Sequence, residues 1–223
     1  MNKNYLISKL EAFAPIDTQE PWDCCGWVIE HSDKEDVCKV MFALTVTEQV
    51  FEQAKAQGCD LVIAHHPLFT VPVQYKDIQI YCAHTNLDKA IGGTTDTILE
   101  NLGLKANRIE GEFVRIVEFE EAIKVEDFAN LLRRISPKLR YVNNMNVEKI
   151  NSVAFCAGSG SEFLENTAVD AFVTGDLKYH TACETSKVVY DIGHFESEVL
   201  IKEKLQQILG IEGIMANEKS PFI

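Results

Sequence analysis

The run Leu61-Val62-Ile63-Ala64-His65-His66-Pro67 joins a short apolar segment to two histidines and a proline. A fully apolar run of this length predicts a strand that is buried on both faces, as in parallel sheets. Pro67 favours extended backbone at His66. In α/β proteins, ligands bind beyond the carboxyl ends of such strands. The run therefore predicts an α/β fold with a histidine-containing site at one edge of a sheet.

Segments with strand and helix patterns alternate along the rest of the chain. Expected strands cover residues 37–44, 61–64, 77–83, 112–118, 139–142, 152–156, 171–174 and 188–192. Expected helices cover residues 4–13, 48–57, 95–102, 125–135, 161–166, 179–185 and 197–209. This alternation is typical of α/β folds with parallel or mixed sheets. Because the two halves share a rhythm of motifs, we expect two α/β lobes with mixed sheets that face each other.

Composition places the chain among ordinary globular proteins, with 46% hydrophobic and 25% charged residues in a total of 223. No apolar run approaches the roughly 18 residues that a transmembrane helix needs. The N-terminus has no apolar signal-peptide segment. Seven cysteines, an odd number without a CxxC motif, fit a reducing compartment. We therefore expect a cytoplasmic protein with no membrane partner.

The formal net charge is −13, from 21 Lys and Arg residues against 34 Asp and Glu residues. A surface this acidic repels the phosphate backbone of nucleic acids. The densest basic patch, which contains Arg133, Arg134, Lys138 and Arg140, has the pattern of a solvated helix face. We therefore expect no nucleic-acid partner.

Five of the six histidines fall in four short motifs at predicted strand ends or helix starts. The motifs span residues 64–67, 83–88, 174–180 and 193–198. Histidine is the commonest metal ligand among side chains, and nearby carboxylates supply the negative charge that a divalent ion needs. The distribution of histidines therefore indicates a metal-binding protein.

Three of these motifs contain candidate ligands. His65 and His66 close a strand, and extended backbone directs their imidazoles apart, which suits two metal ions better than one. Asp88 follows the next strand and can bind one ion or bridge two, although a turn aspartate is the simpler alternative. If a helix begins near His194, Glu198 lies four residues on and shares its face. A plain surface pair is the alternative for these two residues.

The donors in these motifs are nitrogen and oxygen atoms. Three imidazoles and two carboxylates suit Zn, Fe, Mn, Co or Ni, and they argue against a structural zinc site built from cysteines. Five ligands leave open positions on two ions, and hydrolytic chemistry requires such positions. Since the donors come from both halves of the chain, a shared metal site would lie between the lobes.

Two further segments allow two interpretations each. The segment Ala157-Gly158-Ser159-Gly160-Ser161 could hold an anion with its backbone N–H groups, or it could be a plain tight turn. Residues 174–180 combine an acid, a cation, a phenol and the imidazole of His180. Such a combination is typical of catalytic groups or of partners of metal ligands, but also of the first turn of a surface helix.

Five ordered segments, preceded by PWDCCGW, resemble the NGG-interacting-factor-three-like family, also known as GTP cyclohydrolase type 2 homologues. The segments are AHHPLF, AHTNLD with a following GG, CAGSGSEFL, VTGDLKYH and DIGHFESE. The resemblance spans roughly residues 15–209. It implies that two divalent metal ions are bound by His65, His66, Asp88, His194 and Glu198. It also implies that His84 and His180 lie beside the metals as catalytic or polar neighbours.

The resemblance has further implications for architecture and activity. It implies two lobes around the metals, approximately residues 1–110 and 111–223, with interleaving of the two lobes left open. It also implies a toroidal homohexamer. Only a short stretch near residues 111–150 separates the halves, so the chain resembles the compact form without an inserted domain. The implied activity is metal-dependent hydrolysis of a nucleotide or related heterocycle. The alternatives are a non-catalytic metal-binding, metal-trafficking or scaffold protein, and a phosphoesterase.

Overall fold

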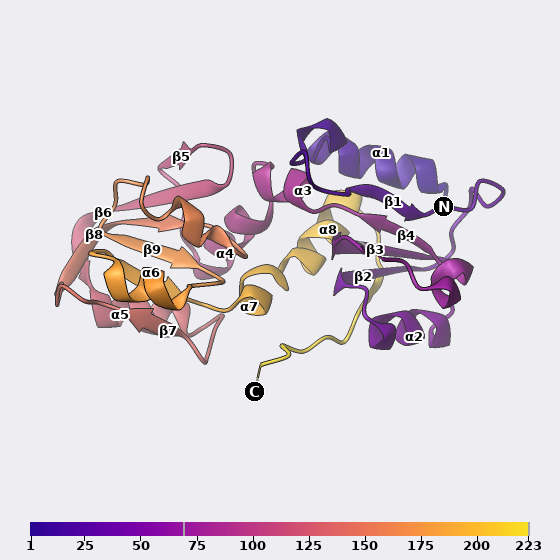
Figure 1. Ribbon diagram of the computed structural model, residues 1–223. Helices are drawn as coiled ribbons and strands as arrows, with labels where there is room; N and C mark the ends of the chain where they lie inside the picture. Colours follow the sequence, from indigo (N-terminus) through magenta and orange to yellow (C-terminus); the bar gives the residue numbers. More distant parts are fainter. Residues whose placement is uncertain (69, 223) are drawn as a thin grey trace. The chain divides into compact units, whose positions relative to one another are not determined.

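A computed structural model describes residues 1–68 and 70–222, so Phe69, the last residue of the AHHPLF motif, lies outside the described residues. The chain divides into two compact units. The first unit contains Met1–Gly93 and Ile201–Ile223, and the second contains Thr94–Leu200. The end of the chain thus returns to the first unit, and the expected lobes, residues 1–110 and 111–223, stay a prediction. Each unit contains one mixed sheet (Figure 1), which confirms the mixed α/β fold class.

The sheet of the first unit has five strands in the order β1-β4-β3-β2-β11. The strands are β1 (Gly26–Ile29), β2 (Val40–Thr45), β3 (Leu61–His66), β4 (Gln79–Cys82) and β11 (Ile214–Met215). Only β1 pairs in the antiparallel direction, with β4, among the pairings described. In the parallel pairing of β2 with β3, Thr45 lies opposite His66. Strand β3 is buried from Leu61 through His65, as the apolar run predicts.

Helices cover both faces of this sheet. They are α1 (Lys3–Phe13), α2 (Glu48–Ala56), α3 (Thr85–Lys89) and α8 (Ile201–Leu209), with the 3-10 turns η1 (Ile16–Thr18) and η2 (Val73–Asp77). In Figure 1, α1 and α8 lie on one side of the sheet and α2 lies on the other. Thr47 caps α2 by accepting a hydrogen bond from the Val50 N–H. The buried Phe51 of α2 packs in one cluster with Met41 and Val62 of the sheet.

The second unit has a six-stranded sheet in the order β5-β6-β8-β9-β10-β7. The strands are β5 (Arg108–Glu110), β6 (Val114–Lys124), β7 (Arg140–Val142), β8 (Lys149–Phe155), β9 (Ala171–Thr174) and β10 (Val188–Asp191). Its helices are α4 (Thr94–Leu102), α5 (Val125–Leu132), α6 (Tyr179–Glu184) and α7 (His194–Glu198), with the 3-10 turn η3 (Gly160–Phe163). Strands β8, β9 and β10 are parallel. Phe128 of α5 contacts Phe155 and Tyr190 of this sheet, which fixes α5 against it.

Two expected helices differ from those observed. The expected helix 161–166 is a 3-10 turn, η3, which is common in short connections. The expected helix 197–209 is instead two helices, α7 and α8, separated at Val199 and Leu200. The helical pattern is continuous through this point, but α7 packs against α4 in the second unit whereas α8 packs against α1 and β2 in the first. Tertiary packing therefore overrides the local pattern.

Two expectations from composition can be examined on the described residues. All seven cysteines are free thiols, and Cys82 and Cys156, which lie in the expected strands 77–83 and 152–156, are buried. Cys38 is exposed, because the strand that was expected to contain it begins only at Val40. Within residues 1–68 and 70–222, no helix has the length and apolar character needed to cross a bilayer.

Candidate metal centre

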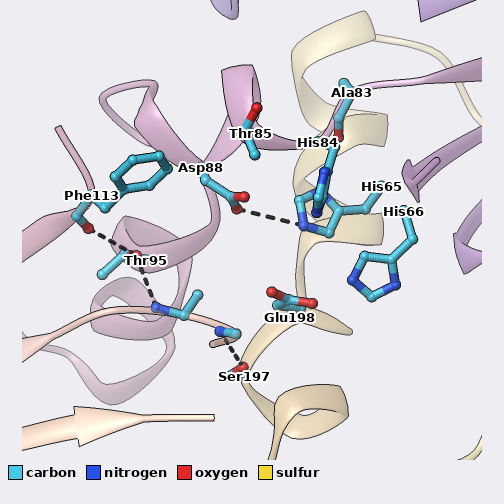
Figure 2. A network of polar contacts seen from close by, with 12 residues as sticks. His65, His66, Ala83, His84, Thr85, Asp88, Thr95, Phe113, Ser197 and Glu198 are labelled. Atoms are coloured by element: carbon cyan, nitrogen blue, oxygen red, sulfur yellow. Dashed lines mark hydrogen bonds and ion pairs between the residues drawn. The ribbon is translucent and has the colours of Figure 1, made fainter. Parts of the chain in front are cut away.

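Three imidazoles gather at the carboxyl ends of β3 and β4 in the first unit (Figure 2). Strand β3 ends with His65 and His66, and His84 is the residue before α3. The ring centroids are 5.0 Å apart for His65 and His66, 5.1 Å for His65 and His84, and 5.6 Å for His66 and His84. One nitrogen of each ring lies within 4.8 Å of the others. The three side chains could therefore hold one metal ion.

Asp88 lies on α3 rather than in the loop that the sequence suggested. Its Oδ1 is 3.5 Å from His65 Nε2, and Figure 2 shows the carboxylate directed at that ring. The His84 carbonyl accepts hydrogen bonds from the N–H groups of Leu87 and Asp88, at 2.8 and 3.0 Å. This short helical turn fixes His84 and Asp88 relative to each other.

The Nδ1 atoms of His65 and His66 are occupied by contacts within the protein. His65 Nδ1 donates to the Ala83 carbonyl at 2.9 Å, and a carbonyl oxygen can only accept. His65 therefore has its proton on Nδ1 and a lone pair on Nε2. His66 Nδ1 is 2.7 Å from Thr45 Oγ1, the residue opposite it in the sheet. Imidazoles that bind metals typically have their second ring nitrogen held in this way.

His84 is held by a buried carboxylate. The side chain of Asp23 is 0% exposed, and both of its oxygens are 3.0 Å from His84 Nδ1. It also accepts hydrogen bonds from the Thr85 N–H and hydroxyl and from the Cys24 N–H. Burial alone would raise the pKa of Asp23, but the hydrogen bonds from Thr85 and His84 outweigh it and hold that pKa well below its usual range. Asp23 is therefore ionised and keeps the His84 proton on Nδ1.

In the second unit, α7 begins at His194 and carries Glu198 four residues later on the same face, as predicted. His194 Nε2 is 3.1 Å from Glu198 Oε2, and His194 Nδ1 is 2.7 Å from Asp176 Oδ2. The hydrogen bond to Glu198, opposed by burial and assisted by Asp176, raises the pKa of His194 to about 9. Once His194 has lost a proton, the pair offers one imidazole and one carboxylate as donors.

Gly158 allows the Glu198 carboxylate to lie close to the backbone. Its φ is +59°, and a Cβ at this position would collide with Glu198 Oε1 and lie 3.5 Å from His194 Cε1. The Gly158 N–H donates to Ser197 Oγ at 2.9 Å, the dashed contact at Ser197 in Figure 2. Glycine therefore suits the backbone conformation here, and an added Cβ would force the Glu198 carboxylate to move.

The glycine-rich turn uses its N–H groups within the protein. In addition to the Gly158 contact with Ser197, the Gly160 N–H donates to Thr174 Oγ1 and the Ala157 N–H donates to Thr95 Oγ1, both at 3.1 Å. These groups are thus not directed at a phosphate. The geometry favours the tight-turn interpretation, in which the turn supports α7.

His180 is an exposed residue of α6. Its ring contacts Tyr179, with centroids 5.5 Å apart, and among the described residues no contact joins it to His194 or Glu198. By contrast, Asp176 of the same motif contacts His194 directly. The catalytic role of His180 stays a prediction.

Three residues that hold these donors were not singled out from the sequence: Asp23, Thr45 and Glu218. The Glu218 carboxylate accepts hydrogen bonds from the N–H groups of Leu44 and Thr45, both at 2.8 Å, and from Lys202 Nζ at 3.1 Å. It therefore fixes the end of β2, where Thr45 contacts the imidazole of His66. A threonine at a strand end and a glutamate near the C-terminus have no local pattern that reveals such roles, whereas the PWD segment could have drawn attention to Asp23.

The donor chemistry fits a divalent transition-metal ion. The clustered atoms are imidazole nitrogens and carboxylate oxygens, and His65 has an Nε2 lone pair to offer. The nearby thiol of Cys82 instead donates to the His65 carbonyl at 2.8 Å, and burial raises its pKa. The candidate site therefore offers nitrogen and oxygen donors.

Comparison with known proteins agrees with this description. The profile of the Duf34/NIF3 (NGG1p interacting factor 3) family matches residues 1–218. A GTP cyclohydrolase 1 type 2 homolog of Clostridium perfringens is 32% identical over 100% of this chain and 99% of the relative. A second, from Clostridium acetobutylicum, is 30% identical over 94% of this chain and 91% of the relative. The crystal structure of a Bacillus cereus protein related to NIF3 has the same fold, with a TM-score of 0.87 at 21% identity over 100% of this chain and 99% of that one. The chain therefore belongs to the Duf34/NIF3 family, as its ordered motifs implied.

Proposed function

We propose that this protein is a metal-dependent hydrolase that acts on a nucleotide or a related heterocycle. Two divalent ions would be bound by His65, His66, Asp88, His194 and Glu198. The observation that carries the proposal is the preorganisation of the imidazoles: the contact of His65 Nδ1 with the Ala83 carbonyl leaves Nε2 for a metal. The names of the Clostridium relatives, GTP cyclohydrolase 1 type 2 homologs, support a nucleotide as substrate.

The two donor sets complement each other chemically. The first unit supplies imidazoles and the Asp88 carboxylate, and the second supplies the pair His194 and Glu198. Neither set alone has enough donors for two ions, so we propose that both sets bind the same two ions. Divalent ions bound there would lower the pKa of coordinated water towards about 7 and polarise an electrophilic substrate atom.

His84 is the candidate for proton transfer. Its Nδ1 is occupied by Asp23, so Nε2 can accept a proton and return it to a leaving group. His180 is the second candidate, on the exposed α6. The family resemblance also supports a cytoplasmic homohexamer.

The first experiment is elemental analysis of the purified chain after incubation with Zn, Mn and Fe(II). We expect about two ions per wild-type chain, the number that suits five nitrogen and oxygen donors with open positions. The Glu198→Gln variant should lose much of this metal. Glu196→Gln is the matched control, because Glu196 lies on the same helix but not four residues from His194, and it should retain the wild-type content. A wild-type chain that stays empty would overturn the proposal.

Activity assays then distinguish the proposed hydrolase from a phosphoesterase and from a non-catalytic metal-binding or scaffold protein. Ring opening of GTP by the metal-loaded protein supports the proposed hydrolase. Hydrolysis of simple phosphoesters alone would support the phosphoesterase, which is disfavoured because the glycine-rich turn uses its N–H groups internally. Full metal content without either activity would support a metal-binding or scaffold protein.

A further inference from the structure

Asp23 is a buried carboxylate that the proposed ligand set does not use. Its side chain is 0% exposed and lies in the loop before β1. Besides both contacts with His84 Nδ1 at 3.0 Å, it accepts the Thr85 N–H at 3.0 Å, the Thr85 hydroxyl at 2.5 Å and the Cys24 N–H at 2.8 Å. A carboxylate with this many donors is fixed in position and strongly favoured in its ionised form.

We propose that Asp23 is a positioning residue for His84, which it fixes in orientation and in the Nδ1–H tautomer, so that Nε2 has the lone pair that accepts a proton. The proposal rests on the function proposed above, in which His84 transfers protons. An ionised carboxylate can only accept hydrogen bonds, so the other tautomer would place the Nδ1 lone pair against two oxygens. That repulsion selects the tautomer without a metal or a substrate.

The same carboxylate also fixes the ring of His84 in space. Thr85 begins α3 directly after His84, so the contacts of Asp23 with both residues fix the ring relative to this helix. The ring is thereby fixed within 5.1 Å of His65 and 5.6 Å of His66, measured between centroids.

The neighbouring thiol does not compete for this role. Cys25 Sγ donates to Asp23 Oδ2 at 3.2 Å, and burial raises the pKa of the thiol to about 11. Cys25 is therefore a neutral donor at pH 7. Asp23 is the charged partner of His84.

The test measures the tautomer of His84 in the metal-free protein by solid-state NMR with 15N-labelled histidine, a method that does not depend on particle size. The spectrum of a His84→Gln variant assigns the His84 signals. We expect a protonated Nδ1 and a bare Nε2 in the wild type. In Asp23→Asn we expect a mixture of tautomers or the Nε2–H form, with the His194 signals unchanged.

Asp176→Asn is the matched control, since Asp176 contacts His194 Nδ1 in the second unit. It should change the His194 signals and leave those of His84 as in the wild type. If Asp23→Asn does not fold, the wild-type spectrum decides, because a proton on Nε2 of His84 overturns the positioning role. Thr85→Val removes one donor to Asp23 but keeps the carboxylate beside His84, so we expect the wild-type tautomer.

A second readout is the metal content of Asp23→Asn. We expect it to match the wild type, while the rate of any metal-dependent hydrolysis falls about 100-fold or more. A wild-type His84 with its proton on Nε2, or an Asp23→Asn spectrum identical to the wild type, would overturn the positioning role. Because the tautomer measurement needs neither metal nor substrate, this failure is distinct from a failure of the proposed hydrolase.

Discussion

The two donor sets differ in what holds their imidazoles. In the first unit, His65 and His66 end a strand in the middle of a parallel array, and the Ala83 carbonyl and the Thr45 hydroxyl hold their Nδ1 atoms. In the second unit, His194 is held by Asp176, whose side chain is 50% exposed. Buried partners keep their geometry because water cannot replace them, whereas an exposed partner competes with solvent. The first donor set is therefore the more strongly preorganised of the two.

The second donor set depends on backbone support instead. Helix α7 has only five residues, too few to be stable by itself. The hydrogen bond from the Gly158 N–H to Ser197 and the packing of α7 against α4 compensate for its length. Side-chain partners therefore determine the first donor set, and a glycine turn determines the second.

The largest expected effect is that of Gly158→Ala. The new Cβ would collide with Glu198 Oε1 in a backbone conformation with φ of +59°, so both the metal content and the free energy of unfolding should fall. We expect a loss of about 3 kcal/mol or more, the sum of backbone strain and overpacking. Urea denaturation and elemental analysis provide the measurements.

Gly103→Ala is the control for Gly158→Ala. Gly103 has a similar φ of +72° but nothing within 4 Å of the added Cβ. It should therefore show only the backbone cost, about 1 kcal/mol, with unchanged metal content. Equal losses in the two variants would mean that the approach of Glu198 to Gly158 is unimportant.

The next largest effect is expected for the side chains that hold His66 and His194. Thr45→Val removes the hydroxyl that contacts His66 Nδ1 at 2.7 Å, and Asp176→Asn weakens the contact with His194 Nδ1. We expect zinc affinity, measured by competition with a chelator, to fall about 10- to 100-fold in Thr45→Val. The loss in Asp176→Asn should be smaller, since water can replace an exposed partner. A larger loss of zinc affinity in Asp176→Asn than in Thr45→Val would show that the first donor set is not the more strongly preorganised one.

A smaller effect, on the free energy of unfolding, is expected from a substitution of Glu218, which holds the end of β2. Glu218→Gln leaves one side-chain acceptor for the two N–H groups of Leu44 and Thr45 and removes the ion pair with Lys202. The free energy of unfolding should fall by about 1–3 kcal/mol, the cost of buried polar groups left unpaired. Glu212→Gln, an exposed site in the same C-terminal segment, should change it by less than about 0.5 kcal/mol. Equal stabilities of the two variants would show that Glu218 does not support the strand end.

The same contacts explain how much could be predicted from sequence. Local patterns predicted the buried strand that ends at His65 and His66, and a helix start that gives His194 and Glu198 one face. The contact of Thr45 with His66 depends on the register of β2 with β3, which no local pattern encodes. The supporting role of Glu218 depends on the return of the chain end to the first unit, which also divides the expected helix 197–209. Long-range pairing, rather than periodicity, therefore determines which side chains hold the donors.

The smallest effect is expected for Glu126→Gln. This variant tests whether the second unit can lose stability without a loss of zinc affinity. Tyr141 and Arg133 donate hydrogen bonds to Glu126 at 2.7 and 2.8 Å, and these contacts, that with Tyr141 above all, lower the pKa of Glu126. A carboxyl whose pKa is lower in the folded state contributes stability above its unfolded pKa of about 4.3, and that contribution is lost as the pH falls through the folded value. Glu126→Gln should therefore be slightly less stable than the wild type in urea at pH 7, with a difference that disappears near pH 3.

High salt should also reduce this difference, because the Glu126 side chain is 57% exposed and its ion pair with Arg133 is screened. Zinc affinity should stay at the wild-type value, since the contacts of Glu126 are with Tyr141 and Arg133 rather than with the α7 donors. A loss of zinc affinity in Glu126→Gln would show that the second donor set responds to the stability of its whole unit. The glycine turn at Gly158 would then not be sufficient to determine the geometry of α7, and the contrast between the two donor sets would lie in their stability rather than in their local partners.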